Sequence, residues 1–145
     1  MQASNGINTG WLRWKTLQTA RAPDAGSAAV ENASYSVSST SYTDMTGYTV
    51  DIQGDGTSRV IVLSVSVEPD STSRTLYLKC IRTTNGVDTD IGSPFQLSVP
   101  GTAGTLTVIA PAWVDSPEVG AHTYRIQGKG SASAVIAVDG NLAVR

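Results

Sequence analysis

Apolar and polar residues alternate with a period of two along most of the chain. Ser34–Ser39 alternates, and Val60–Val67 begins as a continuous apolar run before it alternates. A period of two is typical of β-strands with one buried face, and a continuous apolar run indicates a strand in the middle of a sandwich. The predicted strands cover residues 34–39, 46–52, 60–67, 75–82, 94–99, 104–110, 122–128, 133–138 and 142–144.

Turn signals separate the predicted strands. Asn85-Gly86 predicts a two-residue hairpin. The glycine pairs Gly54–Gly56 and Gly128–Gly130 predict turns, and Asp139–Asn141 predicts a turn before the last short strand. No helical window lies between the strands. This pattern predicts an all-β fold, a single jelly-roll-like antiparallel β-sandwich that spans residues 31–145.

Residues 1–30 have a different character. They contain the motif Trp11-Leu-Arg-Trp14, followed by a stretch rich in Ala, Pro and Gly at residues 20–27, and neither strand nor helix periodicity persists. We expect an extended N-terminal arm. Because large aromatic side chains dominate the energetics of interfaces, Trp11, Leu12 and Trp14 are the candidate anchoring residues of this arm.

The charge content of the chain is low. Charged residues make up 15% of it and the net charge is −2, whereas Ser and Thr supply 34 positions. Soluble domains typically contain about 25% charged residues. This balance excludes a basic nucleic-acid binder and an acidic tail. Since the cores of interfaces are depleted in charge, the deficit instead indicates association between copies of the chain.

Membrane and secretion signals are missing from the sequence. The longest uninterrupted apolar stretch, residues 134–138, is far shorter than the ~20 residues that span a bilayer. The N-terminus lacks the basic region and apolar run of a secretory signal. We therefore expect no membrane partner and a chain that folds in the cytoplasm.

Candidate catalytic residues are few. His122 is the only histidine and stands at the start of a predicted strand, with Asp115 and Ser116 in the preceding loop. These three could form a catalytic group, but no GxSxG motif accompanies them, and a structural histidine at a strand end is the favoured interpretation. Cys80 is the only cysteine, so the chain can form no internal disulfide, and its place in an apolar strand predicts burial.

Carboxylates offer one weak metal candidate. Asp88 and Asp90 share a face of an extended segment and could bind Ca²⁺, but their spacing does not match a calcium loop. Paired carboxylates could also hydrolyse glycosides, although an aromatic content of 6% argues against the groove that such sites need. The residues therefore predict no enzymatic activity, no cofactor and no metal site.

Three segments carry a resemblance to a known group of proteins. They are Ser41–Ile52, the strand Val60–Val67, and Trp113–Gly128, in which the loop Asp115-Ser-Pro and the strand Gly120–Ile126 are the most specific part. Together they resemble the small β-sandwich domains of bacteriophage virion proteins, such as head decoration proteins, head fibres and tail-fibre tips. Many of these resemble the trimeric jelly roll of the tumour necrosis factor and C1q type. The resemblance implies a homotrimer with a structural or adhesive role in the virion, and no catalytic residues.

Two functions remain open from the sequence. The favoured one is a structural bacteriophage virion protein, assembled in the host cytoplasm and attached to other virion proteins through its N-terminal arm. The alternative is a carbohydrate- or receptor-binding module that contacts a glycan on the host surface. Sugars stack on exposed aromatic rings, so the candidate platform residues are Trp113, Tyr42, Tyr48 and Tyr77, although Trp113 fits better as a core residue at the end of the sandwich.

Overall fold

The computed structural model describes residues 28–70, 73–132 and 136–145. These residues form strands and connecting turns, without a helix among them. The strands are β1 (Ala28–Val37), β2 (Thr43–Gly54), β3 (Arg59–Pro69), β4 (Arg74–Thr84), β5 (Val87–Val99), β6 (Thr107–Ile109), β7 (Ala112–Asp115), β8 (Gly120–Gly130) and β9 (Ile136–Val144).

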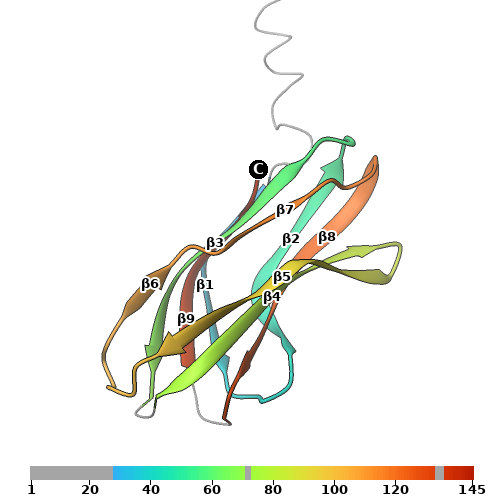
Figure 1. Cartoon of the computed structure of the whole chain (residues 1–145). Coiled ribbons are helices and arrows are strands. Elements are labelled where there is room, and N and C mark those ends of the chain that lie inside the picture. Colours follow the sequence, from blue (N-terminus) through green and yellow to red (C-terminus); the bar gives the residue numbers. More distant parts are fainter. Residues whose placement is uncertain (1–27, 71–72, 133–135) are drawn as a thin grey trace, which may run out of the picture.

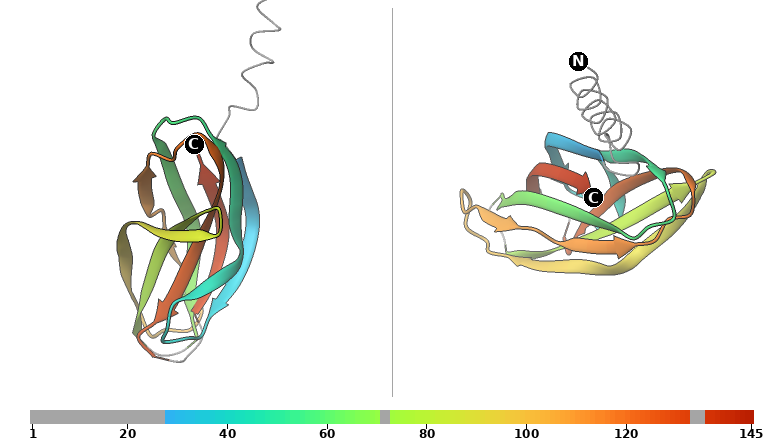
Figure 2. Two further views of the ribbon diagram at one scale, coloured as in Figure 1. Left: turned by 90° about the vertical axis from the view of Figure 1, so that its right-hand side faces the viewer. Right: turned by 90° about the horizontal axis from the view of Figure 1, so that it is seen from above.

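The strands form two antiparallel sheets that face each other (Figures 1 and 2). Sheet A has the order β1-β9-β3-β6, with β7 also paired to β3, and sheet B has the order β2-β8-β4-β5. β6 and β7 lie along successive parts of β3 and therefore occupy a single edge position. Counted in this way, the sandwich has eight strand positions in two sheets of four. The predicted jelly-roll-like sandwich is confirmed.

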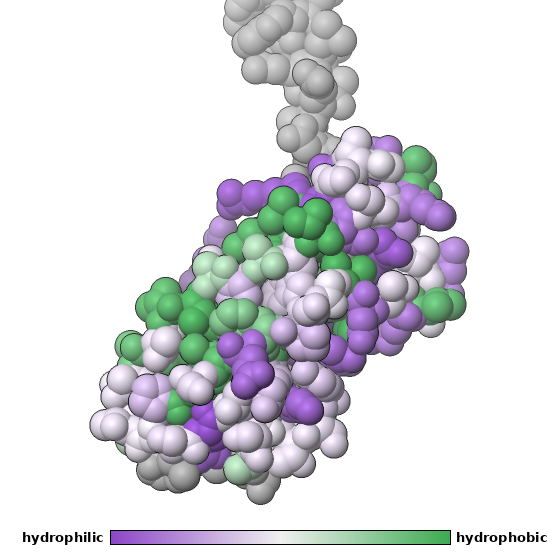
Figure 3. Space-filling model, viewed as in Figure 1, coloured by the Kyte–Doolittle hydropathy of each residue, from purple (hydrophilic) through white to green (hydrophobic). Residues whose placement is uncertain are grey.

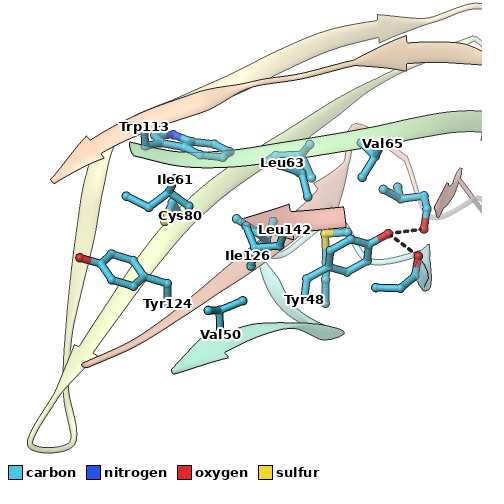
Figure 4. Packing of buried hydrophobic residues seen from close by; sticks show 14 of the residues in the cluster. Tyr48, Val50, Ile61, Leu63, Val65, Cys80, Trp113, Tyr124, Ile126 and Leu142 are labelled. Atoms are coloured by element: carbon cyan, nitrogen blue, oxygen red, sulfur yellow. Dashed lines mark hydrogen bonds between the residues drawn. The ribbon is translucent and has the colours of Figure 1, made fainter. Parts of the chain in front are cut away.

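The core lies between the two sheets and follows the period of two. Along β3, alternate residues such as Ile61, Leu63 and Val65 point inward and are buried. They meet side chains of sheet B, among them the fully buried Tyr48 and Tyr124 (Figure 4). Full burial of one such aliphatic or aromatic side chain contributes about 1.5–3 kcal/mol, so this interface between the sheets holds the fold together.

The hairpin predicted at Asn85-Gly86 is confirmed. Thr84 pairs with Val87, so two residues connect β4 and β5. Both turn residues have positive φ, 51° for Asn85 and 78° for Gly86, which is the conformation of a type I′ turn.

Two predicted turns were wrong, because each lies inside a strand. Gly128–Gly130 forms the end of β8, where a Cβ on Gly128 would lie 2.9 Å from the Met45 sulfur. Asp139–Asn141 lies within β9, and Gly140 has a φ of 156°. A Cβ on Gly140 would lie 2.1 Å from the Ser64 carbonyl oxygen. In both strands glycine allows close packing, rather than a change of chain direction.

The edge of sheet A also differs from the prediction. The strand predicted over residues 104–110 is limited to β6, and β7 was not predicted. Pro111 stands between them and has no N–H to donate, although its carbonyl accepts a hydrogen bond from the Leu63 N–H at 3.0 Å. At the other edge β1 begins at Ala28, inside the predicted arm of residues 1–30. The anchoring candidates Trp11, Leu12 and Trp14 lie outside the described residues.

Candidate functional site

The outer face of sheet B carries a network of ion pairs around Arg125. Its guanidinium lies 2.8 Å from an Asp44 carboxylate oxygen and 2.5 Å from one of Asp88, and it also donates to the Thr83 hydroxyl. Gln127 donates to Asp44 at 2.7 Å. These contacts connect strands β2, β4, β5 and β8 across the sheet. Each exposed ion pair contributes about 1 kcal/mol or less. The main effect of the network is therefore to give each of these charges a partner of opposite sign, and it adds little to the stability of the fold.

Each of the two carboxylates considered for calcium forms an ion pair with a basic side chain of this face. Asp88 is bound by Arg125, and hydrogen bonds from Arg125 and Thr83 lower the pKa of its carboxyl group. Asp90 lies 3.2 Å from the Lys79 ammonium. Within the described ranges, no group of three or more His, Cys, Asp or Glu side chains could hold a metal ion.

Part of the outer face of sheet A is apolar instead. Strand register places Ala29, Ala143, Val62 and Ala112 side by side in one row across four strands. Directly opposite residues of antiparallel strands share a face, so Val60 and Val114 form the next row on the same surface.

The β6 strand adds an exposed valine to the same face, separated from these rows by Ser64 and Asn141. Val108 pairs with Ser66 and is 80% exposed, and Val114 is 66% exposed. Figure 3 shows hydrophobic residues gathered over β3, β6 and β7. We call the surface formed by Ala29, Val60, Val62, Val108, Ala112, Val114 and Ala143 the apolar face. Large exposed apolar patches are uncommon on monomeric proteins and mark contact surfaces.

The sequence contained a signal for this face that the strand prediction did not use. Residues 60–63 are four consecutive apolar residues, and a strand of a two-layer sandwich buries only every second one in the core. The other two, Val60 and Val62, therefore had to lie on the outer surface. Val114 could not be assigned to it, because β7 was not predicted.

His122 is buried at the start of β8 and is held from both sides. Its Nε2 lies 2.7 Å from the Glu118 carbonyl oxygen, to which it donates, and its Nδ1 lies 2.7 Å from the Thr84 hydroxyl. A neutral imidazole protonated on Nε2 satisfies both contacts, with the Thr84 hydroxyl as donor to Nδ1. Both nitrogens thus anchor the loop before β8 and the end of β4.

The other two residues of the candidate catalytic group have different partners. Asp115 accepts hydrogen bonds from Arg82 and from the Tyr124 hydroxyl, each at 2.6 Å. The Ser116 hydroxyl lies 2.9 Å from the Ser58 hydroxyl. Asp115 therefore takes part in a contact between the two sheets. Neither Asp115 nor Ser116 is hydrogen-bonded to His122.

Cys80 is buried in the core on β4. Burial raises the pKa of its thiol to about 12, with a further contribution from the negative charge of Asp115. The thiol is therefore neutral at physiological pH, as expected for a small core residue.

The proposed sugar-stacking residues are not all at the surface. Tyr48 is fully buried, and its hydroxyl is within hydrogen-bonding distance of the Ala33 and Val138 carbonyl oxygens, at 2.8 and 2.9 Å. Trp113 is also buried (Figure 4), and its indole N–H donates to the Ser93 carbonyl at 3.0 Å. Neither ring offers a face to a sugar. Tyr42 and Tyr77 are half-buried and lie on the sheet B side.

Comparison with known proteins gives a likeness of fold. No family model and no curated protein matches the sequence. Among solved structures, infectious bursal disease virus Gx strain matches with a TM-score of 0.54 at 16% identity, over 81% of this chain and 31% of that chain. A crystal structure of the particle of the same virus matches with a TM-score of 0.55 at 13% identity, over 81% of this chain and 30% of that chain.

A sugar-binding protein, the EclA C-terminal domain, matches with a TM-score of 0.45 at 14% identity, over 84% of this chain and 80% of that domain. The chain spans about a third of the length of the viral chains that it matches. The TM-scores of the viral chains show that they share the β-sandwich fold with this chain. The search for membrane spans found no helix of sufficient length and apolarity in the part of the chain that the structure describes.

Proposed function

We propose that this chain is a structural protein of a bacteriophage virion that associates with further copies of itself, as a homotrimer, through the apolar face of sheet A. The observation that carries the proposal is the contrast between the two outer faces. Most charges on the sheet B face are paired with one another, whereas the sheet A face presents Val60, Val62, Val108 and Val114 in the described residues. The free energy decreases when a partner covers an apolar surface of this kind.

A second copy of the chain is the occupant that fits this face best. The row of Ala29, Ala143, Val62 and Ala112 consists of small side chains, so another β-sheet can approach it closely. Identical copies carry a net charge of only −2 each and therefore repel one another weakly. In a trimer each contact is heterologous, so one part of the apolar face of each copy would pack against a different part of the next copy around the three-fold axis.

The virion role is supported by the fold. Two of the similar solved chains come from an icosahedral virus, and the jelly-roll order of strands is common in capsid domains. The N-terminal arm would then attach the trimer to other virion proteins through Trp11, Leu12 and Trp14.

Light scattering coupled to size-exclusion chromatography tests the association. The full chain should elute with a mass of about 45 kDa, three times 15.1 kDa. Val114→Glu should shift it to the monomer mass. Val87→Glu is the matched control, because both valines are 66% exposed but Val87 lies at the hairpin of sheet B. A monomeric wild type, or equal behaviour of the two variants, would contradict the proposal.

Attachment to the particle requires a separate test. The double variant Trp11→Ala/Trp14→Ala should still form the trimer but should be lost from assembled particles, with Lys15→Ala as the neighbouring control. Quantification of the protein in purified particles measures this. Incorporation of the double variant at the wild-type level would refute the anchoring role of the arm.

A further inference from the structure

A group of two tyrosines and two lysines lies on the outer face of sheet B, away from the apolar face. The Lys129 ammonium lies 4.8 Å from the centre of the Tyr42 ring and 5.0 Å from that of Tyr77, and the Lys79 ammonium lies 4.9 Å from the Tyr42 ring. We call these four residues the tyrosine–lysine cluster. Strand register supports the arrangement, because Tyr77 is directly opposite Lys129.

The two lysines of the cluster carry more positive charge than the neighbouring carboxylate neutralises. Lys79 pairs with Asp90, whose side chain is 64% exposed. Lys129 makes no ion pair within the described residues, and its contacts are the two aromatic rings. A cation–π contact at an exposed site contributes about 0.5–1 kcal/mol and leaves the charge of the ammonium in place. The carboxylates on this face contact Arg125, Lys79 or Thr123. None of them contacts Lys129, so its charge is not paired with a carboxylate of this face.

Uncharged hydrogen-bonding groups surround the cluster on the same face. Gln96 is opposite Tyr77, and the next row contains Thr75 opposite Ser98. Gln96 and Ser98 are exposed. A bound molecule would thus meet an ammonium group, aromatic surface and several hydroxyl and amide groups at one place, which is the combination found in ligand sites.

We propose that the tyrosine–lysine cluster binds an acidic sugar, whose carboxylate pairs with Lys129 and whose ring packs against Tyr42 or Tyr77. The C–H groups of a pyranose ring suit the negative face of an aromatic ring, and a carboxylate forms strong charge-assisted hydrogen bonds with an ammonium. An inorganic anion would use the lysines but would make no contact with the surfaces of the two rings. A neutral sugar would use the rings but leave Lys129 without an anion.

Calorimetric titration of the full chain tests this assignment with two acidic saccharides, each beside a neutral counterpart. The probes are trigalacturonic acid with its methyl ester, and 3′-sialyllactose with lactose. At least one acidic saccharide should bind with a dissociation constant of about 1 mM or less. The neutral counterpart should bind at least about tenfold more weakly, because it lacks the carboxylate.

Lys129→Met should weaken binding of the acidic saccharide by about tenfold or more, since it keeps the length of the side chain and removes the charge. Tyr77→Leu should weaken it as well. Arg145→Met is the matched control, because it removes one positive charge at the end of the chain in sheet A and should leave the affinity unchanged. A thermal unfolding midpoint close to that of the wild type shows that the variants remain folded.

Several results would overturn the assignment. These are no binding of either acidic saccharide up to about 10 mM, equal affinity for the neutral counterpart, wild-type affinity in Lys129→Met, or tighter binding of a single-stranded oligonucleotide. The outcome is independent of the assembly proposal, because light scattering of Lys129→Met measures the trimer separately.

Discussion

The Tyr124 hydroxyl on β8 donates a hydrogen bond to Asp115 on β7, with 2.6 Å between the two oxygens, and so connects the two sheets. Arg82 on β4 binds the same carboxylate oxygen at 2.6 Å. The side chains of Arg82 and Asp115 are only 18% and 12% exposed. Burial, together with the hydrogen bond to Asp115 and its negative charge, raises the pKa of Tyr124. The tyrosine therefore remains a hydrogen-bond donor at any physiological pH.

Removal of this contact between the sheets should be costly. Tyr124→Phe should lower the free energy of unfolding by about 1–3 kcal/mol, because it leaves one acceptor site of Asp115 without its donor. Asp115→Ala should cost about 3 kcal/mol or more, because it leaves the guanidinium of Arg82 largely buried without its anion. Equilibrium urea unfolding measures both values.

A surface carboxylate provides the control for Asp115. Asp51 accepts a hydrogen bond from Thr123 on the exposed face of sheet B. Asp51→Ala should therefore cost less than about 1 kcal/mol. If Asp115→Ala and Asp51→Ala destabilised the protein equally, the contact between the sheets would contribute nothing beyond an ordinary surface interaction.

Gly140 and Gly104 form a second matched pair. Both have positive φ, 156° and 79°, so alanine is strained at either position. A Cβ on Gly140 would lie 2.1 Å from the Ser64 carbonyl oxygen, whereas a Cβ on Gly104 has no atom within 4 Å. Gly140→Ala should thus lower the free energy of unfolding by at least about 2 kcal/mol more than Gly104→Ala, because β3 and β9 must separate.

Urea unfolding of both variants measures the difference between the two glycines. A Gly140→Ala chain that is insoluble while Gly104→Ala folds normally agrees with the expectation. Equal stability of the two variants would show that Gly140 does not pack this closely against the backbone of β3.

Cys80 should be protected from thiol reagents in the folded protein. Its pKa is raised to about 12 by burial, and its side chain is closed to solvent. At about pH 8 the native protein should react far more slowly than the urea-unfolded chain, whose thiol has its ordinary pKa of about 8.5. The stability contributed by the neutral thiol is complete below about pH 8.5 and is lost as the pH rises toward about 12.

Labelling with a chromogenic disulfide reagent measures this protection. Reaction of the native protein at the rate of the unfolded chain would contradict the buried position of Cys80. The variant Cys80→Ser should show no labelling, which confirms that the signal comes from this thiol.

The strand pattern predicted the fold more completely than it predicted the surfaces. Alternation in Ser34–Ser39 and the turn at Asn85-Gly86 are local signals. The turn appears where it was expected, and the alternation belongs to β1, which ends at Val37. Gly128 and Gly140 misled the prediction, because their role is close packing against Met45 and Ser64. That role depends on residues far away in the sequence.

The candidate site could be predicted only in part for the same reason. Tyr42 and Tyr77 were identified as aromatic residues with a possible role at the surface, but their contact with Lys129 depends on the pairing of β4 with β8. The same holds for the apolar face, which results from the register of five strands. Sequence periodicity indicates which residues share a face of one strand, but it does not indicate which strands are neighbours.

Acid should weaken the ion pairs of the sheet B face. Burial acts to raise the pKa of Asp44, but hydrogen bonds from Gln127 and Arg125 lower it overall, and Arg125 lowers that of Asp88. A group with a lowered pKa in the folded state contributes stability above its unfolded pKa and loses it as the pH falls. The thermal midpoint should therefore decrease from about pH 4 downward. Arg125→Met should be less stable than the wild type at about pH 5, and this difference should become smaller at about pH 2.5.

Lys129→Met is the control for the acid experiment, because it removes the same charge without breaking an ion pair of the described residues. Its difference from the wild type should stay nearly constant over this pH range. The prediction concerns the change of the difference with pH, so a general loss of stability in either variant does not affect it. A constant difference for Arg125→Met would mean that Asp44 and Asp88 do not depend on Arg125 for their lowered pKa values.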